Sequence, residues 1–307
     1  MSSAIVQISD THFGTEIAQV ERALHALIGE VAPRLLIVSG DVTQRARRSQ
    51  FAAARRFLDT LGDVRVLATP GNHDIPMFAL AQRCLRPYSH YREAFGRDLE
   101  PVFTSDRLLV QCVNTTRWFR RKHGQISQAQ IDRVTARLLR SRPEQLRIVV
   151  AHHPVLAIRD SDNNNLLRGH ARAGEAWMAA GVDIVMGGHI HLPYIRPLHL
   201  EMENPPHHSW VVQAGTAVSR RVREGIPNSV HVLRYAESGA VQCSVERWDY
   251  QTSVKKFQLL HSVELPLSRG PLPAASSLVA TNDVEAEGRL HDLADLSDLE
   301  RERCALE

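Results

Sequence analysis

The strongest constraint on this chain is a repeated arrangement in which a short apolar run is followed at once by a polar cluster. Three such runs, at 4–8, 35–38 and 64–67, are separated by segments at 20–31 and 51–61 whose apolar residues recur at helical spacing. Short apolar runs bounded by turn residues are typical of buried strands. The resulting strand–helix–strand–helix–strand order predicts parallel pairing in an α/β sheet.

The pattern continues in the middle of the chain and then changes. Three more buried strands are expected at 108–113, 148–151 and 184–186, and a helix at 131–138. Beyond residue 186 the helical periodicity stops, and consecutive strands are expected at 210–213, 230–235 and 241–248. We therefore expect an α/β protein with two packed mixed β-sheets flanked by helices, an αββα sandwich.

Five of these runs end in side chains that can bind metal. The clusters are Asp10-Thr-His12, Gly40-Asp41, Gly71-Asn72-His73-Asp74, His152-His153-Pro154 and Gly187-Gly188-His189-Ile190-His191. Ligands bind beyond the carboxyl ends of strands in open α/β sheets, so parallel strands would bring the clusters to one edge. Within Asp-x-His and His-x-His, an extended chain would point both side chains the same way. Carboxylate, amide oxygen and imidazole suit Mn, Fe or Zn.

In this order the five motifs resemble those of the calcineurin-like metallophosphoesterase superfamily, over roughly residues 4–250. Ile8-Ser-Asp-Thr-His12, Pro70-Gly-Asn-His-Asp74 and the His152-His-Pro pattern are similar to the group of class III cyclic nucleotide phosphodiesterases and glycerophosphodiesterases. The resemblance implies two divalent or trivalent metal ions. It implies that one metal is held by Asp10, His12 and His191, the other by Asn72, His152 and His189, and that Asp41 bridges them. His153 is not expected to be a ligand.

The resemblance also implies a mechanism in which His73 and Asp41 are catalytic. Two metals about 3.5–4 Å apart can share a water and lower its pKa toward neutrality. The resulting hydroxide would attack phosphorus in line with the leaving alkoxide. His73 resembles the family histidine that contacts the substrate phosphate, and we predict that it protonates the leaving group. The predicted function is a binuclear metal-dependent phosphodiesterase acting on cyclic nucleotides or glycerophosphodiesters.

Two alternatives remain open at this stage. A nuclease of the same superfamily would need a nucleic-acid surface, and only the basic–aromatic segment Arg117–Lys122 offers one. A solvated loop anchored by Trp118 and Phe119 is the favoured interpretation of that segment. The second alternative, a catalytically silent binding or scaffold protein, is disfavoured by the complete ligand set. A lipid A-pathway hydrolase is also disfavoured, because that family carries Arg where His73 stands.

Three polar positions near the motifs have other interpretations. Asp74 could orient a ligand imidazole or cap the following turn. The Asn163–Asn165 cluster is more typical of a turn than of a substrate contact. Asn114, which also follows a predicted strand, is interpreted as structural.

Charge divides the chain into two parts. Segment 266–307 carries four Arg and nine Asp or Glu, a net charge of −5. Because the whole chain has a net charge of +3, residues 1–265 carry a net charge of +8. A basic body suits an anionic substrate. We expect a metallophosphoesterase domain at 1–265, then a linker and an acidic tail at 266–307. The tail's regularly spaced leucines suggest a short helix through which two copies could associate, and a partly disordered acidic tail is the equal alternative.

The chain has no apolar run of about 18 residues, so no membrane-spanning helix is expected. Its first residues form neither a basic leader nor a long apolar stretch, which predicts a cytoplasmic protein. Its four cysteines form no CxxC pair, which argues against a zinc ribbon or a disulfide framework.

Overall fold

The computed structural model describes residues 2–201, 205 and 207–267. They belong to the first of two compact units, Met1–Gly270. Apart from residues 266 and 267, the predicted linker and acidic tail lie outside the described residues. The tail's helix and its role in oligomerisation therefore stay predictions.

Two six-stranded sheets form the centre of this unit. The first has the order β12-β11-β10-β1-β2-β3. Its strands are β1 (Ser2–Ile8), β2 (Leu35–Val38), β3 (Arg65–Ala68), β10 (Ser229–Ala236), β11 (Cys243–Gln251) and β12 (Lys256–Glu264). β1, β2 and β3 pair in parallel, as predicted. β10 pairs with β1 antiparallel, and β11 and β12 follow as further antiparallel strands.

The second sheet has the order β4-β5-β6-β7-β9-β8. Its strands are β4 (Val102–Thr104), β5 (Leu108–Val113), β6 (Leu146–Ala151), β7 (Ile184–Gly187), β8 (Tyr194–Pro197) and β9 (Trp210–Gln213). β5, β6, β7 and β9 are parallel, with antiparallel β4 and β8 at the edges. The inner faces of the two sheets share one apolar core, in which Ile5 and Ile37 of the first sheet lie with Val110 and Ile148 of the second.

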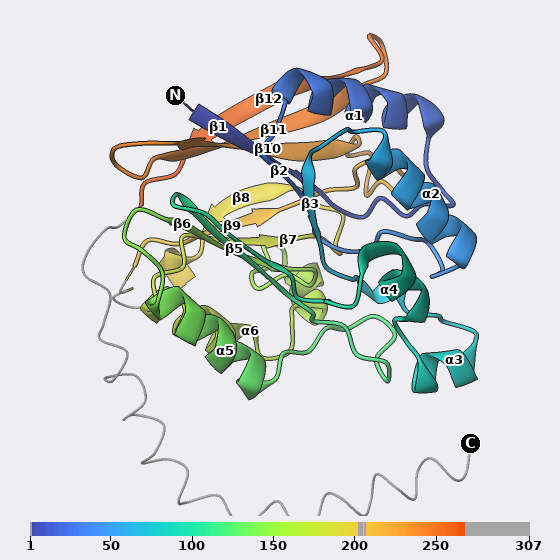
Figure 1. The fold of residues 1–307 in the computed structure, drawn as a ribbon, viewed down its shortest axis with the longest axis horizontal. Helices are drawn as coiled ribbons and strands as arrows, with labels where there is room; N and C mark the ends of the chain where they lie inside the picture. Colours follow the sequence, from blue (N-terminus) through green and yellow to red (C-terminus); the bar gives the residue numbers. More distant parts are fainter. Residues whose placement is uncertain (1, 202–204, 206, 268–307) are drawn as a thin grey trace, which may run out of the picture. The chain divides into compact units, whose positions relative to one another are not determined.

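Helices cover the outer faces of both sheets (Figure 1). On the first sheet, α1 (Ala18–Val31) and α2 (Arg48–Asp59) bury Leu24, Ile28 and Phe51 in a core with β1 and β2. On the second, α5 (Gln128–Leu139) and α6 (His170–Ala179) bury Val134 and Trp177. The remaining helical segments are α3 (Leu80–Leu85), α4 (Ser89–Phe95) and the 3₁₀ turns η1 (Asn72–Asp74), η2 (Asp160–Asn165) and η3 (His199–Glu201). The predicted fold class is confirmed.

The structure differs from the expectation in several elements. β9 is not consecutive with β10 in one sheet, because the chain crosses from the second sheet to the first between them. The sequence analysis missed α6, whose buried stripe includes the small residues Ala173 and Gly174 and so gives a weak apolar period. It also missed edge strand β12, in which only Phe257 is buried. Among the described residues, no helix is long and apolar enough to cross a membrane.

Candidate metal centre

The five predicted clusters come together where the carboxyl ends of the two sheets meet. Backbone hydrogen bonds join the loops within the first sheet, from Asp10 N to Gly40 O (3.1 Å) and from His12 N to Asp41 O (3.0 Å). The Asp10 carboxylate then accepts from His189 N (3.0 Å), which connects the first sheet to the second. The clusters were expected to converge at one edge, and the structure assembles them there from strands of both sheets.

The backbone at these clusters is not extended, contrary to the expectation for Asp-x-His and His-x-His. Five of the predicted ligands have left-handed backbone angles, with φ of 50° at Asp10, 42° at His12, 48° at Asp41, 75° at His189 and 56° at His191. Left-handed non-glycine residues cost roughly 1–2 kcal/mol each and gather at functional sites. The fold therefore maintains local strain to aim these side chains.

One predicted ligand group lies between β1 and β7. The Asp10 Oδ1 atom is 3.1 Å from His191 Nε2 and 3.8 Å from His12 Nε2, and the two imidazole Nε2 atoms are 3.2 Å apart. His191 Nδ1 donates to the Arg221 carbonyl, which leaves its Nε2 lone pair facing the carboxylate. Lone pairs at such distances repel, and a cation between them removes the repulsion.

Asp41 lies between this group and the second one. Its Oδ1 is 3.4 Å from His152 Nε2 and its Oδ2 is 3.8 Å from His12 Nε2, so its two oxygens face different histidines. His152 Nδ1 donates to Ser39 O (2.8 Å), which again leaves Nε2 as the free nitrogen. Asn72 Nδ2 donates to Arg121 O (3.3 Å), which turns the amide oxygen away from that loop.

Four ligand atoms at this centre are buried and have no hydrogen-bond partner among the described residues. They are Asp10 Oδ1, Asn72 Oδ1, His152 Nε2 and His189 Nε2. Leaving a buried polar atom unpaired costs about 1–3 kcal/mol, so four in one place need an explanation. Oxygen and imidazole nitrogen are the donors that Mn, Fe and Zn accept, and the residues therefore fit a metal centre.

The electrostatics of the centre agree with this fit. Burial opposes ionisation of Asp10 and Asp41, but the surrounding histidines outweigh it and lower the pKa of both carboxyls. Burial likewise opposes the charge on His152, yet Asp41 and Asp10 raise its pKa to about 9. A site that stabilises buried carboxylates and attracts protons to an imidazole is one in which a metal cation competes with protons.

Residues 3–193 match the family model described as calcineurin-like phosphoesterase. The chain belongs to this family. The predicted superfamily is thus confirmed, and the residues matched include all five clusters. A protein from Rhodococcus erythropolis described as "Probable cyclic nucleotide phosphodiesterase" is 25% identical over 203 residues, which cover 61% of this chain and 64% of that protein. The chain thus spans less than two thirds of that relative's length. The family match supports a phosphoric ester hydrolase.

Among solved structures, the chain is similar to the purple acid phosphatase PPD1 from yellow lupin (Lupinus luteus) seeds. The TM-score is 0.65 and the sequence identity 11%, over 86% of this chain and 53% of the lupin chain. At this identity the likeness shows the shared fold alone.

Two further histidines of this calcineurin-like phosphoesterase lie beside the ligands but have both ring nitrogens occupied. His153 Nε2 donates to Lys122 O (2.9 Å) and its Nδ1 accepts from Thr115 Oγ1 (2.7 Å). Burial, and after it the neighbouring His152, lower the pKa of His153 to about 3. It lies within ligand distance of His152 and His189 but has no free lone pair, in keeping with its expected exclusion from the ligand set.

His73 is the second of these. Its Nδ1 donates to Gln44 O (2.9 Å), so its Nε2 carries the lone pair, and this atom is 3.1 Å from Arg221 Nη1. Its backbone N–H donates to Asp41 Oδ1 (2.8 Å). In this arrangement the His73 Nε2 lone pair faces Arg221, whereas the predicted acid role requires a proton on that atom.

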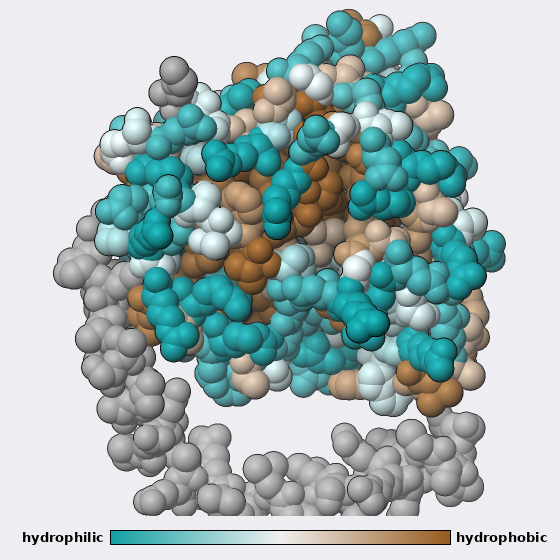
Figure 2. Space-filling model, viewed as in Figure 1, coloured by the Kyte–Doolittle hydropathy of each residue, from teal (hydrophilic) through white to brown (hydrophobic). Residues whose placement is uncertain are grey.

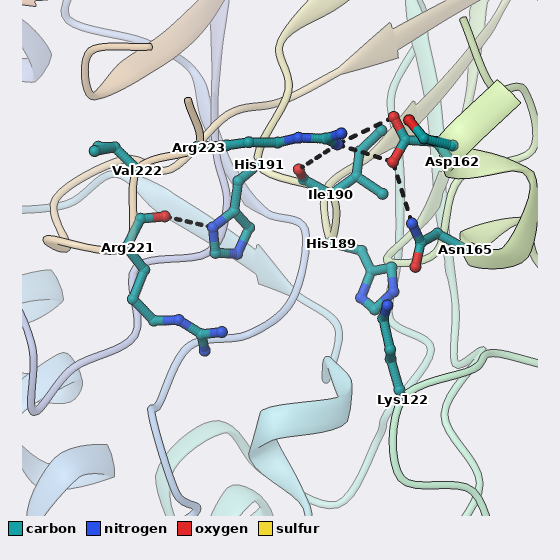
Figure 3. Close-up of a pocket in the computed structure, with 10 residues that line it drawn as sticks. Lys122, Asp162, Asn165, His189, Ile190, His191, Arg221, Val222 and Arg223 are labelled. Atoms are coloured by element: carbon teal, nitrogen blue, oxygen red, sulfur yellow. Dashed lines mark hydrogen bonds and ion pairs between the residues drawn. The ribbon is translucent and has the colours of Figure 1, made fainter. Parts of the chain in front are cut away.

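A cavity of about 480 Å³ opens beside the predicted ligands His189 and His191 (Figure 3). The sequence analysis missed Arg221, which borders this cavity on the side of His191, and did not place Lys122, which lies near His189. The signal for Arg221 was available, because Arg220, Arg221 and Arg223 form a basic run between β9 and β10. A cationic wall beside a candidate metal centre suits a phosphate ester.

The guanidinium of Arg221 is held at one end only. Its Nη1 donates to Gln44 Oε1 (3.2 Å) and lies beside His73 Nε2, whereas Nε and Nη2 make no hydrogen bond within the described residues. These two N–H groups form the edge that binds two oxygens of a phosphate at once. Arg223, by contrast, is committed to Asp162, at 2.9 and 3.0 Å.

The polar positions with open interpretations can now be placed. Asp74 does not orient a ligand imidazole, and its role is wider than capping one turn. Its buried carboxylate accepts from Val42 N (3.0 Å), Thr43 N (2.8 Å) and Gly71 N (2.9 Å), and so ties the loop after β2 to the loop after β3. Burial and then Asp41 raise its pKa to about 6, although these backbone bonds lower it.

The loop Arg117–Lys122 was expected to be solvated, with two anchoring aromatics. Its backbone instead supports the site, because Arg121 O accepts from Asn72 and Lys122 O from His153. Trp118 and Phe119 do not anchor it, since both side chains are exposed. Arg117 donates to Asn114 O (3.1 Å) and Arg120 to Gln125 Oε1 (2.9 Å).

Asn114 agrees with its structural interpretation, whereas both interpretations of the Asn163–Asn165 cluster stay open. Asn114 Oδ1 accepts from the backbone of Thr116 (3.0 Å), a structural role. In η2, Asn165 donates to Asp162 Oδ1 (3.1 Å) at the cavity wall.

Proposed function

We propose that this calcineurin-like phosphoesterase hydrolyses phosphodiester bonds of small molecules, either cyclic nucleotides or glycerophosphodiesters, at a binuclear metal centre. The observation that carries the proposal is the group of unpartnered oxygen and nitrogen atoms that converge from both sheets beside a cationic cavity. The name of the Rhodococcus erythropolis relative favours cyclic nucleotides as the first substrates to test.

The proposed ligand sets are those that the family resemblance implies, and the closeness of Asp10, His12 and His191 supports the first of them. Asp10, His12 and His191 would hold one metal, Asn72, His152 and His189 the other, and Asp41 both. The donor set suits Mn, Fe or Zn. When bound, the metals supply a water of lowered pKa and positive charge near the phosphoryl oxygens.

The other tasks belong to side chains around the ligands. Ser39 O and Arg221 O hold the Nδ1 protons of His152 and His191, so both rings keep Nε2 toward the centre. The free edge of Arg221 would bind two non-bridging phosphate oxygens. Lys122 would attract the anion from the other side of the cavity. His73 would position Arg221.

The roles of His73 as an acid and as a positioning residue can be separated by experiment. If His73 protonates the leaving group, His73→Asn will slow esters with poor leaving groups far more than p-nitrophenyl esters. If it positions Arg221, the variant will raise KM similarly for both kinds of ester. We expect the second result, because its Nε2 faces a guanidinium.

Two other functions are less well supported. A nuclease would need the Arg117–Lys122 segment as its nucleic-acid surface, but Arg117 and Arg120 are engaged in internal hydrogen bonds. A catalytically silent scaffold would have no need to keep strained, unpartnered ligand atoms together. A cytoplasmic location remains a prediction.

The deciding experiment is hydrolysis by the Mn-reconstituted full chain. The panel contains bis(p-nitrophenyl) phosphate, p-nitrophenyl phosphate, cyclic AMP, a glycerophosphodiester and single-stranded DNA. Asp41→Asn is compared with Asp59→Asn, a matched change at an exposed aspartate paired with Arg55. We expect diester cleavage that only Asp41→Asn abolishes. No cleavage by a chain with verified bound metal would refute the enzyme proposal, and preference for DNA would favour the nuclease.

A further inference from the structure

In the short helix α3 and the residues before it, large apolar side chains are exposed and an arginine is buried. The side chains of Phe78, Leu80 and Leu85 are 76%, 62% and 81% exposed, whereas Arg83 between them is only 5% exposed. Arginine is among the residues least often buried, and a surface helix normally turns its apolar side chains inward. In Figure 2 hydrophobic side chains reach the surface at the lower right, where Figure 1 places α3.

Hydrogen bonds of the buried arginine fix this arrangement. Arg83 donates to Pro76 O (3.0 Å), Trp118 O (2.5 Å) and Arg120 O (2.6 Å). These bonds satisfy the guanidinium and tie α3 to the loop after β5, whose Trp118 and Phe119 are also exposed. The five exposed side chains Phe78, Leu80, Leu85, Trp118 and Phe119, here called the α3 patch, therefore belong to two segments held together by one side chain.

Positive charge surrounds the α3 patch. The Arg45 guanidinium lies 5.9 Å from the centre of the Phe78 ring, and that of Arg120 lies 5.4 Å from the Phe119 ring. Arg86 and Arg121 are exposed next to patch residues in sequence. Segments 76–86 and 117–123 contain no Asp or Glu. Lys122, in the second segment, also lines the cavity at the candidate metal centre, so the segment that carries Trp118 and Phe119 extends to that cavity.

We propose that the α3 patch binds the surface of an anionic lipid bilayer. Exposed leucine and aromatic side chains enter the interface between headgroups and acyl chains, and neighbouring Arg and Lys bind anionic headgroups. The patch combines both features and lacks acidic residues, so its charge complements a negative membrane. The proposal adds a location to the proposed function and does not depend on it, because membrane binding needs neither metal nor catalysis.

The ring geometry disfavours single-stranded nucleic acid as the occupant. Bases would have to stack on aromatic faces. Arg45 and Arg120 lie over the Phe78 and Phe119 rings, and Trp118 meets Phe119 edge to face, with an interplanar angle of 85°. The exposed leucines of α3 would also have no partner on a nucleic acid.

The test is co-sedimentation of the full chain, without substrate, with two kinds of vesicle: phosphatidylcholine alone, and phosphatidylcholine with 30% phosphatidylglycerol (a composition chosen at roughly the anionic content that gives a strong surface potential). The double variant Leu80→Ser/Leu85→Ser is compared with Leu259→Ser/Leu260→Ser, a matched change at exposed leucines of β12. Circular dichroism melting checks that each variant is folded.

We expect binding to the anionic vesicles that weakens with salt. The partition coefficient should fall at least about tenfold in the α3 variant, because burial of each leucine contributes on the order of 1.5–3 kcal/mol. The β12 variant should bind as the wild type does. Binding that is absent, or unchanged in a folded α3 variant, would overturn the proposal. So would tighter binding to a single-stranded oligonucleotide, or self-association that the α3 variant abolishes.

Discussion

Replacement of Arg221 tests whether the cavity wall binds the substrate phosphate. Its Nη1 is anchored to Gln44 and His73, and its Nε–Nη2 edge is free. A hydrogen bond to a charged group contributes about 1.5–3 kcal/mol, and two bonds from one guanidinium are not fully additive. We take the two hydrogen bonds of this edge to stabilise the transition state by about 3 kcal/mol in total. Their loss in Arg221→Gln should lower kcat/KM by roughly a hundredfold. Arg221→Lys keeps the charge but not the paired donors, and should lose about tenfold.

The assay is steady-state hydrolysis of bis(p-nitrophenyl) phosphate and of the preferred natural diester by Mn-loaded protein. Arg220→Gln is the matched control, because it removes the same charge from the exposed neighbouring residue. Metal content is measured for each variant, since Arg221 O also holds His191. Activity of Arg221→Gln within about twofold of Arg220→Gln, with metal content unchanged, would refute the phosphate-binding role. Equal losses in the Lys and Gln variants would contradict the predicted difference between them, because the charge alone would then contribute nothing.

Three more predictions follow from buried or crowded positions. Burial lowers the pKa of His231 to about 3, below its unfolded value near 6.5, so stability is lost as pH falls from 6.5 toward 3. As the pH is lowered from 8 to 5, the free energy of unfolding of His231→Leu should therefore rise by about 2 kcal/mol relative to that of the wild type, as measured by urea denaturation. A difference between the two proteins that does not change with pH would contradict this. A Cβ on Gly188 would lie 2.0 Å from Ser9 Oγ, whereas one on Gly29 meets nothing within 4 Å. Gly188→Ala should thus reduce metal binding and Gly29→Ala should not, as measured by metal analysis; equal retention would show that the site can relax. Free Mn²⁺ at a hundred times its Kd should stabilise wild type by about 2.7 kcal/mol in thermal melts but not Asp41→Asn, and an equal shift in both would place Mn²⁺ elsewhere.

The sequence predicts the parallel part of this fold well, because buried strands such as Leu35–Val38, and residues 148–151 of β6, are continuous apolar runs with clear ends. It predicts edge elements poorly. In β12 most side chains face solvent, so the strand lacks the alternation that would reveal it. In α3 the leucines point outward, and the buried Arg83 makes the hydrogen bonds that accompany this orientation.

The candidate ligands could be named from the sequence because each follows a strand end directly. The groups that orient them could not, since they come from distant loops. The carbonyls of Ser39, Arg121 and Arg221 hold His152, Asn72 and His191, and a backbone carbonyl leaves no trace in residue type. The expected extended geometry was wrong for a related reason. Two sheets must meet at the site, and the chain turns sharply through left-handed residues to reach it.

This two-sheet origin links metal binding to folding. The first proposed group takes Asp10 and His12 from the end of β1 and His191 from the end of β7. The second takes Asn72 from the end of β3 and both histidines from β6 and β7. Neither sheet alone supplies a complete set, so each metal would cross-link the two sheets at the edge of their shared apolar core. Metal loading should then slow separation of the sheets, and amide hydrogen exchange in β2 and β6 should slow together when metal is added.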